Sequence, residues 1–169
     1  VVVRVAEVSR ALRLATLRFN FRGVGGSTGI HDEGRGERVD VGAALDHLAA
    51  LIGATPLALA GYSFGAAMAA SVAARRQGLA GLALIAPPLA MRELPLAALA
   101  AVAGPVLVVA GTADEHCPGE ALERLRGAAP RAGIHTIEGA NHFFFGKLFP
   151  LGEAIGAWAR EVIGVVREP

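Results

Sequence analysis

The sequence predicts a single α/β domain over residues 1–169, built on a doubly wound and mostly parallel sheet. Short apolar runs alternate with segments of helical periodicity, which is the pattern of parallel strands joined by crossover helices. Within the apolar runs, such as residues 105–110, polar and apolar positions do not alternate. This uniform apolarity is typical of strands that helices cover on both faces. The length suits one domain, and the sequence shows no repeat and no interdomain linker.

The first part of the chain is predicted to contain a helix, a strand and a second helix. Apolar residues recur at helical spacing from Val1 to Leu12, so we expect a helix over residues 2–13. Residues 14–20 indicate a strand, and glycines within residues 23–29 mark a long loop after it. A stripe of apolar residues spaced by three or four predicts the second helix, over residues 37–52.

The rest of the chain is predicted to alternate strands and helices. Strands are expected over residues 57–61, 81–86, 105–111 and 133–138. A helix begins directly after Phe64, and two more are predicted over residues 119–126 and 147–165. Residues 89–103, which are rich in Ala and Leu, form a short segment before the strand that begins at residue 105.

A candidate nucleophile lies at the turn between the strand at residues 57–61 and the helix after Phe64. The turn reads Gly-Tyr-Ser-Phe-Gly, with Ser63 at its centre. A serine on such a strained turn projects its hydroxyl clear of the sheet, and the two glycines let strand and helix approach closely. The same pattern recurs around Ser27, but no helical periodicity begins directly after it. Ser63 is therefore the predicted nucleophile.

Residues suited to act as acid and base follow two later strands. Asp114 comes after the strand at residues 105–111, and His142 comes after the strand at residues 133–138. The carboxyl ends of parallel strands meet at one edge of an open sheet, which is where ligands bind in such folds. The chain order serine, acid, histidine also accompanies this kind of turn. We therefore expect the three side chains to converge.

These residue types suit acyl-transfer chemistry. A serine hydroxyl is a poor nucleophile until a neutral imidazole removes its proton, which is the role predicted for His142. The Asp114 carboxylate would hold that imidazole in one tautomer and stabilise the imidazolium. The backbone N–H of Phe64 is predicted to donate to the oxyanion. Tyr62 and Phe143 are expected to contact the substrate. The alternative for the phenylalanines at residues 143–145 is a place in the core, with one of the three as a wall of the acyl pocket.

Each assignment has a structural alternative. Asp114 can instead cap the helix that follows, with Glu115 as the alternative acid, and His142 can be an ordinary loop histidine. Asp114, His116 and Cys117 lie close in sequence, but their spacing matches no recognised metal site, so we expect no metal. Cys117 is expected to be a small apolar filler. Surface or loop positions are expected for three histidines, namely His31, His47 and His116.

Composition limits the classes of partner. The net charge is +1 and charges of both signs are scattered along the chain, so a nucleic-acid partner is not expected. A single cysteine cannot form an internal disulfide, and no secretory leader pattern opens the chain, so we expect a cytoplasmic protein. The hydrophobic content is 53%, but Gly and Pro interrupt the uncharged stretches at residues 48–74 and 94–113. No membrane span is expected from such interrupted stretches.

Residues 61–65, together with Asp114 and His142, resemble the nucleophile turn, acid and base of the α/β-hydrolase superfamily. The run Arg-Phe-Asn-Phe-Arg-Gly-Val-Gly at residues 18–25 and the run at residues 140–144 are most similar to a group of small, mostly uncharacterised bacterial serine hydrolases. The resemblance implies an esterase or thioesterase that cleaves a small-molecule ester or thioester through a Ser63 acyl-enzyme and needs no cofactor. Acyl transfer to an acceptor other than water would use the same residues.

The start of the chain departs from that group. Its members carry a strand and a His-Pro-x-x-x-Gly-Gly-like loop before the helix predicted at residues 2–13. In the superfamily's order that strand lies between the strands at residues 14–20 and 57–61, and its loop supplies the second oxyanion donor. The departure leaves a second interpretation open, a noncatalytic binding or scaffolding protein with an incomplete oxyanion hole.

The superfamily inserts its cap at the place of residues 89–103. This cap-like segment is short here, so we expect an open cleft rather than a lidded tunnel. Small or flexible acyl substrates are expected to suit such a cleft.

Overall fold

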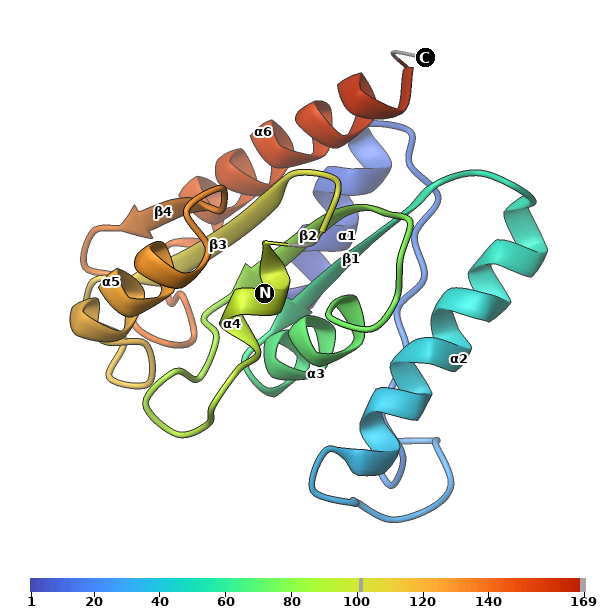
Figure 1. Cartoon of the computed structure of the whole chain (residues 1–169), viewed down its shortest axis with the longest axis horizontal. Helices are drawn as coiled ribbons and strands as arrows, with labels where there is room; N and C mark the ends of the chain where they lie inside the picture. Colours follow the sequence, from blue (N-terminus) through green and yellow to red (C-terminus); the bar gives the residue numbers. More distant parts are fainter. Residues whose placement is uncertain (101, 168–169) are drawn as a thin grey trace.

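Four parallel strands form one sheet in the computed structural model, which describes residues 1–100 and 102–167. The strands are β1 (Leu57–Tyr62), β2 (Leu79–Ile85), β3 (Val106–Gly111) and β4 (Gly133–Ile137). They lie in the order β1-β2-β3-β4, and each neighbouring pair is parallel. Helices lie on both faces of the sheet (Figure 1), so the predicted fold class is confirmed.

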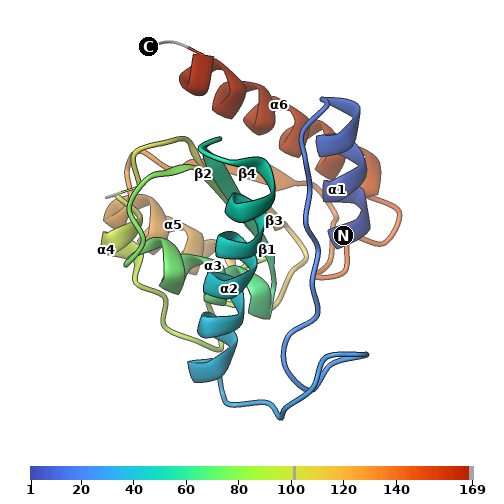
Figure 2. The ribbon, with the colours of Figure 1, turned by 90° about the vertical axis from the view of Figure 1, so that its right-hand side faces the viewer.

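The helices divide between the two faces of the sheet. They are α1 (Val2–Ala11), α2 (Arg35–Ile52), α3 (Phe64–Ala73), α4 (Leu96–Leu99), α5 (Gly119–Ala128) and α6 (Leu148–Arg167). Helices α1 and α6 lie together on one side, and the others lie on the opposite side (Figure 2). The cap-like segment at residues 89–103 contains α4, and its residue 101 lies outside the described residues.

The core consists of two apolar layers, one on each face of the sheet. Along β2, Leu82 and Leu84 belong to the layer under α3, whereas Ala83 and Ile85 belong to the layer under α6. Both faces of the strand are therefore buried, which explains its uniformly apolar sequence. On the α6 side, the Trp158 indole N–H also donates to the Pro105 carbonyl at 3.0 Å and joins the helix to the sheet.

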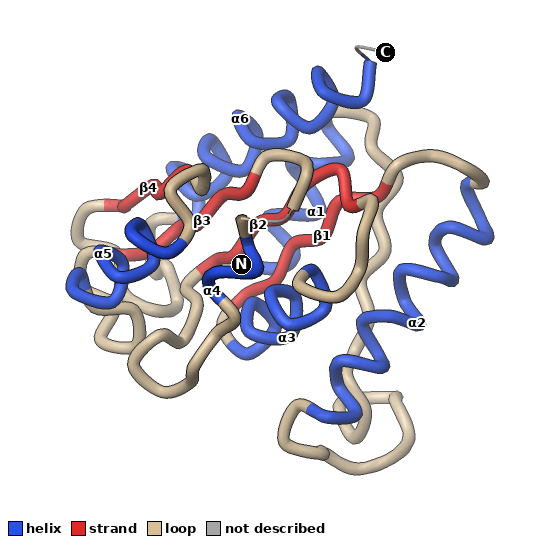
Figure 3. Tube along the Cα trace, in the orientation of Figure 1, coloured by secondary structure: helices blue, strands red, loops and turns tan. Residues whose placement is uncertain are grey.

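The strand predicted over residues 14–20 is not formed. This segment passes beside the sheet without a strand partner (Figure 3). Residues 15–20 take part in none of the backbone–backbone hydrogen bonds found in the described residues, and Leu17 and Phe19 are 38% and 40% exposed. A strand needs a hydrogen-bonded neighbour, which an extended propensity does not provide. The prediction is wrong here because, within the described residues, β1 is the end strand of the sheet and pairs only with β2.

Candidate active site

Ser63 lies on a strained turn between β1 and α3. Its φ is +53°, a left-handed value that is costly for a residue with a side chain. The surrounding backbone holds it there, because the Ser63 N–H donates to the Ile85 carbonyl at 2.9 Å and the Ser63 carbonyl accepts N–H groups from the first turn of α3. A Cβ atom on Gly61 would collide with the Gly65 carbonyl. Glycine at position 61 therefore permits the close approach of strand and helix.

The three side chains predicted to converge form one hydrogen-bonded row. Ser63 Oγ lies 2.8 Å from His142 Nε2, and His142 Nδ1 lies 3.0 Å from each carboxylate oxygen of Asp114. The residues follow β1, β4 and β3, whose carboxyl ends meet at one edge of the sheet. Asp114 and His142 are 4% and 9% exposed, whereas Ser63 is half-buried. The row is thus shielded at the carboxylate end and open at the hydroxyl end.

The loop after β3 fixes the Asp114 carboxylate. Its Oδ1 accepts the N–H of His116 at 2.9 Å, and the Asp114 N–H donates to the Gly111 carbonyl. Pro118, rather than Asp114, directly precedes α5, so Asp114 is not the cap of that helix. The alternative acid, Glu115, is exposed. The geometry therefore pairs Asp114 with the imidazole.

His116 belongs to this site, whereas the sequence predicts only a surface or loop position for it. Its ring packs edge-to-face against the His142 ring, with centroids 4.7 Å apart. Its carbonyl accepts the N–H of Ala90, so the loop after β3 is joined to the segment after β2. The sequence signal for this placement is its position two residues after Asp114, at the carboxyl end of a strand.

Tyr62 and Phe143 flank the imidazole. The Tyr62 hydroxyl donates to the His142 carbonyl at 3.0 Å, and the two ring centroids are 5.6 Å apart. Burial, and to a smaller extent the charge of Asp114, raise the pKa of Tyr62, so its hydroxyl keeps its proton at neutral pH. The Phe143 ring lies edge-on to His142 at 5.5 Å and is 58% exposed. Tyr62 thus joins the His142 loop to the nucleophile turn, while Phe143 presents apolar surface to solvent.

The backbone N–H of Phe64 has no backbone acceptor among the described residues. It lies at the N-terminus of α3, where the helix leaves such groups free and carries partial positive charge. Three groups from two connections pack on the Phe64 ring: Phe21 at 5.5 Å and His31 at 5.6 Å, both between α1 and α2, and the Arg92 guanidinium at 5.3 Å, between β2 and α4. No local sequence pattern indicates this packing, because both connections are distant from Phe64 in the chain.

A buried carboxylate organises the loop that carries His31. Glu37 is fully buried, accepts the N–H groups of Asp32 and Gly34 at 2.8 Å each, and lies 2.8 Å from His31 Nδ1. Burial by itself would raise the pKa of Glu37, but the backbone N–H donors outweigh burial and lower it. The charged carboxylate therefore ties this loop to the start of α2.

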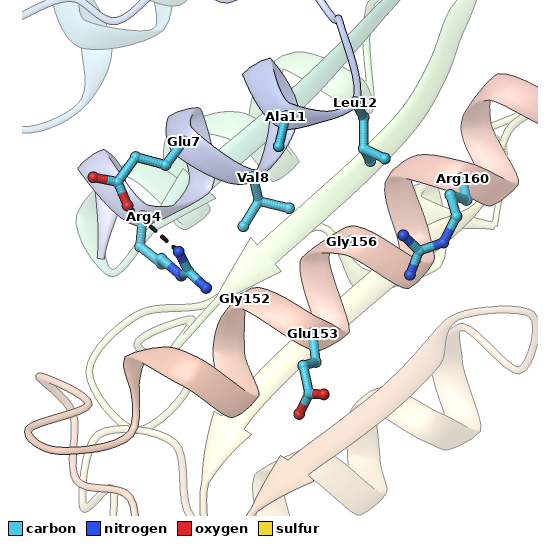
Figure 4. Close-up of a pocket in the computed structure, with 9 residues that line it drawn as sticks. All are labelled: Arg4, Glu7, Val8, Ala11, Leu12, Gly152, Glu153, Gly156 and Arg160. Carbon is cyan, nitrogen blue, oxygen red and sulfur yellow. Dashed lines mark ion pairs between the residues drawn. The ribbon is translucent and has the colours of Figure 1, made fainter.

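Two cavities lie away from the hydrogen-bonded row. A cavity of about 300 Å³ between α1 and α6 is lined by Arg4, Gly152 and Arg160, among others (Figure 4). A second cavity, of about 560 Å³, lies between residues 17–28 and α2. None of the three residues of the row lines either cavity.

Within the described residues, no cluster of three or more His, Cys, Asp or Glu side chains is placed to hold a metal ion. Cys117 is 1% exposed, and burial raises the pKa of its thiol to about 12, so the thiol stays protonated and unreactive at neutral pH. In the same part of the chain, no helix combines the length and the apolarity needed to cross a bilayer.

Comparison with known proteins identifies a family and solved relatives. The sequence model of the dienelactone hydrolase family matches residues 29–159. An α/β serine hydrolase homologue from Coxiella burnetii is 36% identical with a TM-score of 0.81, covering 92% of this chain and 74% of that chain. An α/β serine hydrolase without lid from Xanthomonas campestris is 33% identical with a TM-score of 0.83, covering 94% of this chain and 72% of that chain.

A curated relative is longer than this chain. An uncharacterized protein from Rickettsia prowazekii is 35% identical over 147 residues, which make up 82% of this chain. The match covers 62% of the Rickettsia protein, so this chain spans less than two thirds of the length of that relative.

Proposed function

This chain belongs to the dienelactone hydrolase family, within the α/β-hydrolase superfamily, and on that premise we propose that it is a serine hydrolase. It cleaves a carboxylic ester or thioester through an acyl-enzyme on Ser63, with Asp114 and His142 completing a catalytic triad. One observation carries this proposal. Ser63 Oγ lies 2.8 Å from His142 Nε2 while both oxygens of Asp114 lie 3.0 Å from His142 Nδ1.

In the first half-reaction, neutral His142 Nε2 accepts the Ser63 proton as Oγ bonds to the substrate carbonyl carbon. The Asp114 carboxylate accepts the Nδ1–H hydrogen bond and stabilises the imidazolium. The Phe64 N–H donates to the oxyanion and so lowers the activation barrier by about 3 kcal/mol. The imidazolium then gives its proton to the alcohol or thiol as the bond to that leaving group breaks. The acyl group remains on Ser63 Oγ.

In the second half-reaction, water takes the place of the leaving group. His142 Nε2 accepts a proton from the water as its oxygen bonds to the acyl carbon, and the imidazolium returns that proton to Ser63 Oγ as the acid departs. The free serine is restored, and besides substrate and water the steps use only side chains and one backbone N–H of this chain. The serine mechanism therefore requires no cofactor.

The substrate is a small or flexible ester or thioester that enters from an open cleft. Between β2 and β3, the described residues contain only the four-residue helix α4, and a solved relative is an enzyme without lid. The exposed Phe143 ring and the ring of Tyr62 provide contacts beside the imidazole.

The single, buried Cys117 supports a reducing, cytoplasmic setting.

A fluorophosphonate probe tests the nucleophile directly, because it forms a covalent bond with an activated serine. Wild-type protein is expected to be labelled, and Ser63→Ala is expected to lose all labelling. Ser27→Ala is the matched control, since Ser27 lies in the other Gly-x-Ser-x-Gly run and its hydroxyl donates to the Asn20 carbonyl. Equal labelling of wild type and Ser63→Ala would exclude the proposal.

A noncatalytic binding or scaffolding protein is the second candidate, and one observation favours it. Phe64 N–H is the one oxyanion donor that we identify among the described residues, whereas the holes of such hydrolases combine it with an N–H from a second loop. This candidate predicts a cooperative thermal melt together with no probe labelling and no hydrolysis of a simple ester.

A further inference from the structure

Two exposed phenyl rings extend outward from the imidazole of His142. The Phe143 ring is edge-on to the imidazole, with centroids 5.5 Å apart and planes at 87°. The Phe145 ring stacks on Phe143, again at 5.5 Å, with planes at 26°. Phe143 and Phe145 are 58% and 75% exposed, so the pair presents a continuous apolar surface that begins at the reacting groups. Exposed apolar surface of this kind commonly marks a binding site.

The loop holds both rings in place before any ligand arrives. The Asn141 side-chain oxygen accepts the N–H of Phe143 at 3.1 Å and the N–H of Phe145 at 3.3 Å. Between them, Phe144 is fully buried with φ of +55°, and its N–H donates to the Asn141 carbonyl at 3.0 Å. The buried Phe144 anchors the loop in the core while its neighbours stay outside. The backbone that carries the rings is therefore ordered before a ligand binds, and little backbone conformational entropy is lost on binding.

Proton transfer from His142 to the leaving group indicates that the leaving group, rather than the acyl group, lies near these rings. His142 Nε2 must reach the leaving-group oxygen or sulfur in order to protonate it. The leaving group therefore lies against the imidazole, and Phe143 is packed on that same imidazole. A chain that leaves the reacting atom on the Phe143 side of the imidazole would pass over Phe143 and then over Phe145.

We propose that Phe143 and Phe145 form an aromatic ledge that binds the leaving group, so that the preferred substrates are esters or thioesters of apolar alkyl or aryl alcohols or thiols. The inference rests on the serine hydrolase function proposed above and adds the chemical class of the leaving group. Each methylene laid on the ledge is half covered. We expect it to raise kcat/KM about twofold, against roughly fourfold for full burial.

The test compares two ester series in a pH-stat assay. The alcohol series contains the methyl, butyl, hexyl and octyl esters of butanoic acid, and the acyl series contains the methyl esters of butanoic, hexanoic and octanoic acids. In wild type, kcat/KM is expected to rise along the alcohol series and to change less than twofold along the acyl series. A flat alcohol series, or an equal rise in both series, overturns the ledge.

Variants then assign the rise to the rings. Phe145→Ala is expected to lower the octyl-to-methyl ratio of kcat/KM about tenfold, and Phe145→Trp is expected to keep it. Phe149→Ala is the matched control, because it removes a phenyl group that is 68% exposed on α6 and that no described ring contact joins to His142. An unchanged ratio in Phe145→Ala, or an equal loss in Phe149→Ala, overturns the ledge.

Two further measurements separate the possible failures. A thermal melt confirms that Phe145→Ala is folded, as expected for a side chain that is 75% exposed. The fluorophosphonate probe reports the triad independently of the ledge. If the probe labels the protein but kcat/KM stays flat along the alcohol series, the ledge is rejected and the hydrolase function is retained. If the probe does not label the protein, both the hydrolase function and the ledge are rejected.

Discussion

The two edges of β1 differ in how they are held. One edge pairs with β2 over the length of the strand, and the pairing continues past it, where Ser63 N–H donates to Ile85. The other edge has no strand partner among the described residues, and residues 15–20 pass beside it without backbone–backbone hydrogen bonds. All three residues of the proposed triad follow strands that pair with one another. Hydrogen-bonded strand pairing therefore positions the proposed triad.

Side chains rather than a ladder hold the region beyond the free edge. Arg22 forms hydrogen bonds of 2.8 to 3.2 Å with Asp40 of α2 through its side chain and its backbone N–H. Glu37 holds the loop that includes His31, and the rings of Phe21 and His31 pack on Phe64. This region therefore supports the Phe64 N–H, the proposed oxyanion donor, indirectly. We expect mutations there to have smaller effects than mutations on the paired side.

The largest effect is expected at the carboxylate of the paired side. Asp114→Asn keeps the shape of the side chain but favours the wrong tautomer of the imidazole, so kcat is expected to fall by about 10⁴. Steady-state hydrolysis of a simple ester measures the loss. Glu115→Gln, at the exposed neighbouring position, serves as the control and is expected to keep wild-type kcat. A similar fall in both variants would remove Asp114 from the triad.

Core truncations compare the stability of the two regions directly. Leu82→Ala deletes a fully buried side chain from β2 and is expected to cost about 3–4 kcal/mol of unfolding free energy. Leu17→Ala changes the unpaired segment, where the side chain is 38% exposed, and is expected to cost less than about 1 kcal/mol. Urea unfolding followed by circular dichroism measures both. Equal costs would mean that residues 14–20 are packed as tightly as the sheet.

The two glycines that flank Ser63 differ in how closely other atoms approach them, so their substitutions are expected to differ in stability cost. Gly61→Ala places a Cβ against the Gly65 carbonyl, so we expect a loss of about 2–3 kcal/mol of stability. Gly65→Ala meets no atom within 4 Å and is expected to be tolerated. The two variants differ only in position, so thermal melts of both isolate the strand–helix contact. A melt of Gly61→Ala like that of wild type would show that strand and helix can separate without cost.

The smallest effect concerns acid stability beyond the free edge. Hydrogen bonds from the Arg22 side chain, together with its charge and N–H, outweigh burial and lower the pKa of Asp40. The folded pKa lies below the unfolded one, so this contribution is present at neutral pH and is lost as the pH falls below about 4. Between pH 5 and pH 3, wild type is expected to lose about 2 °C more in Tm than Asp40→Asn. Equal losses would exclude this pair as a source of acid sensitivity.

The sequence predicts the residues that converge, but not all of their surroundings. Ser63, Asp114 and His142 each follow a predicted strand, and parallel topology alone brings strand ends to one edge. The edge-to-face contact of His116, the hydrogen bond from Tyr62 to the His142 carbonyl, and the packing of Arg92 on Phe64 join separate loops. Loop conformations depend on such contacts as much as on local sequence, so these partners are visible only in the folded chain.

The sequence by itself determined where helices and buried strands form, because periodicity records which side chains face the core, and it determined the chain order of the proposed nucleophile, acid and base. Tertiary structure alone decided that residues 14–20 are not a strand, since strand formation requires a partner that local propensity cannot supply. It also decided which loop side chains surround the imidazole. Propensity and periodicity are local properties of the chain, whereas hydrogen-bonded pairing and packing depend on neighbours distant in sequence.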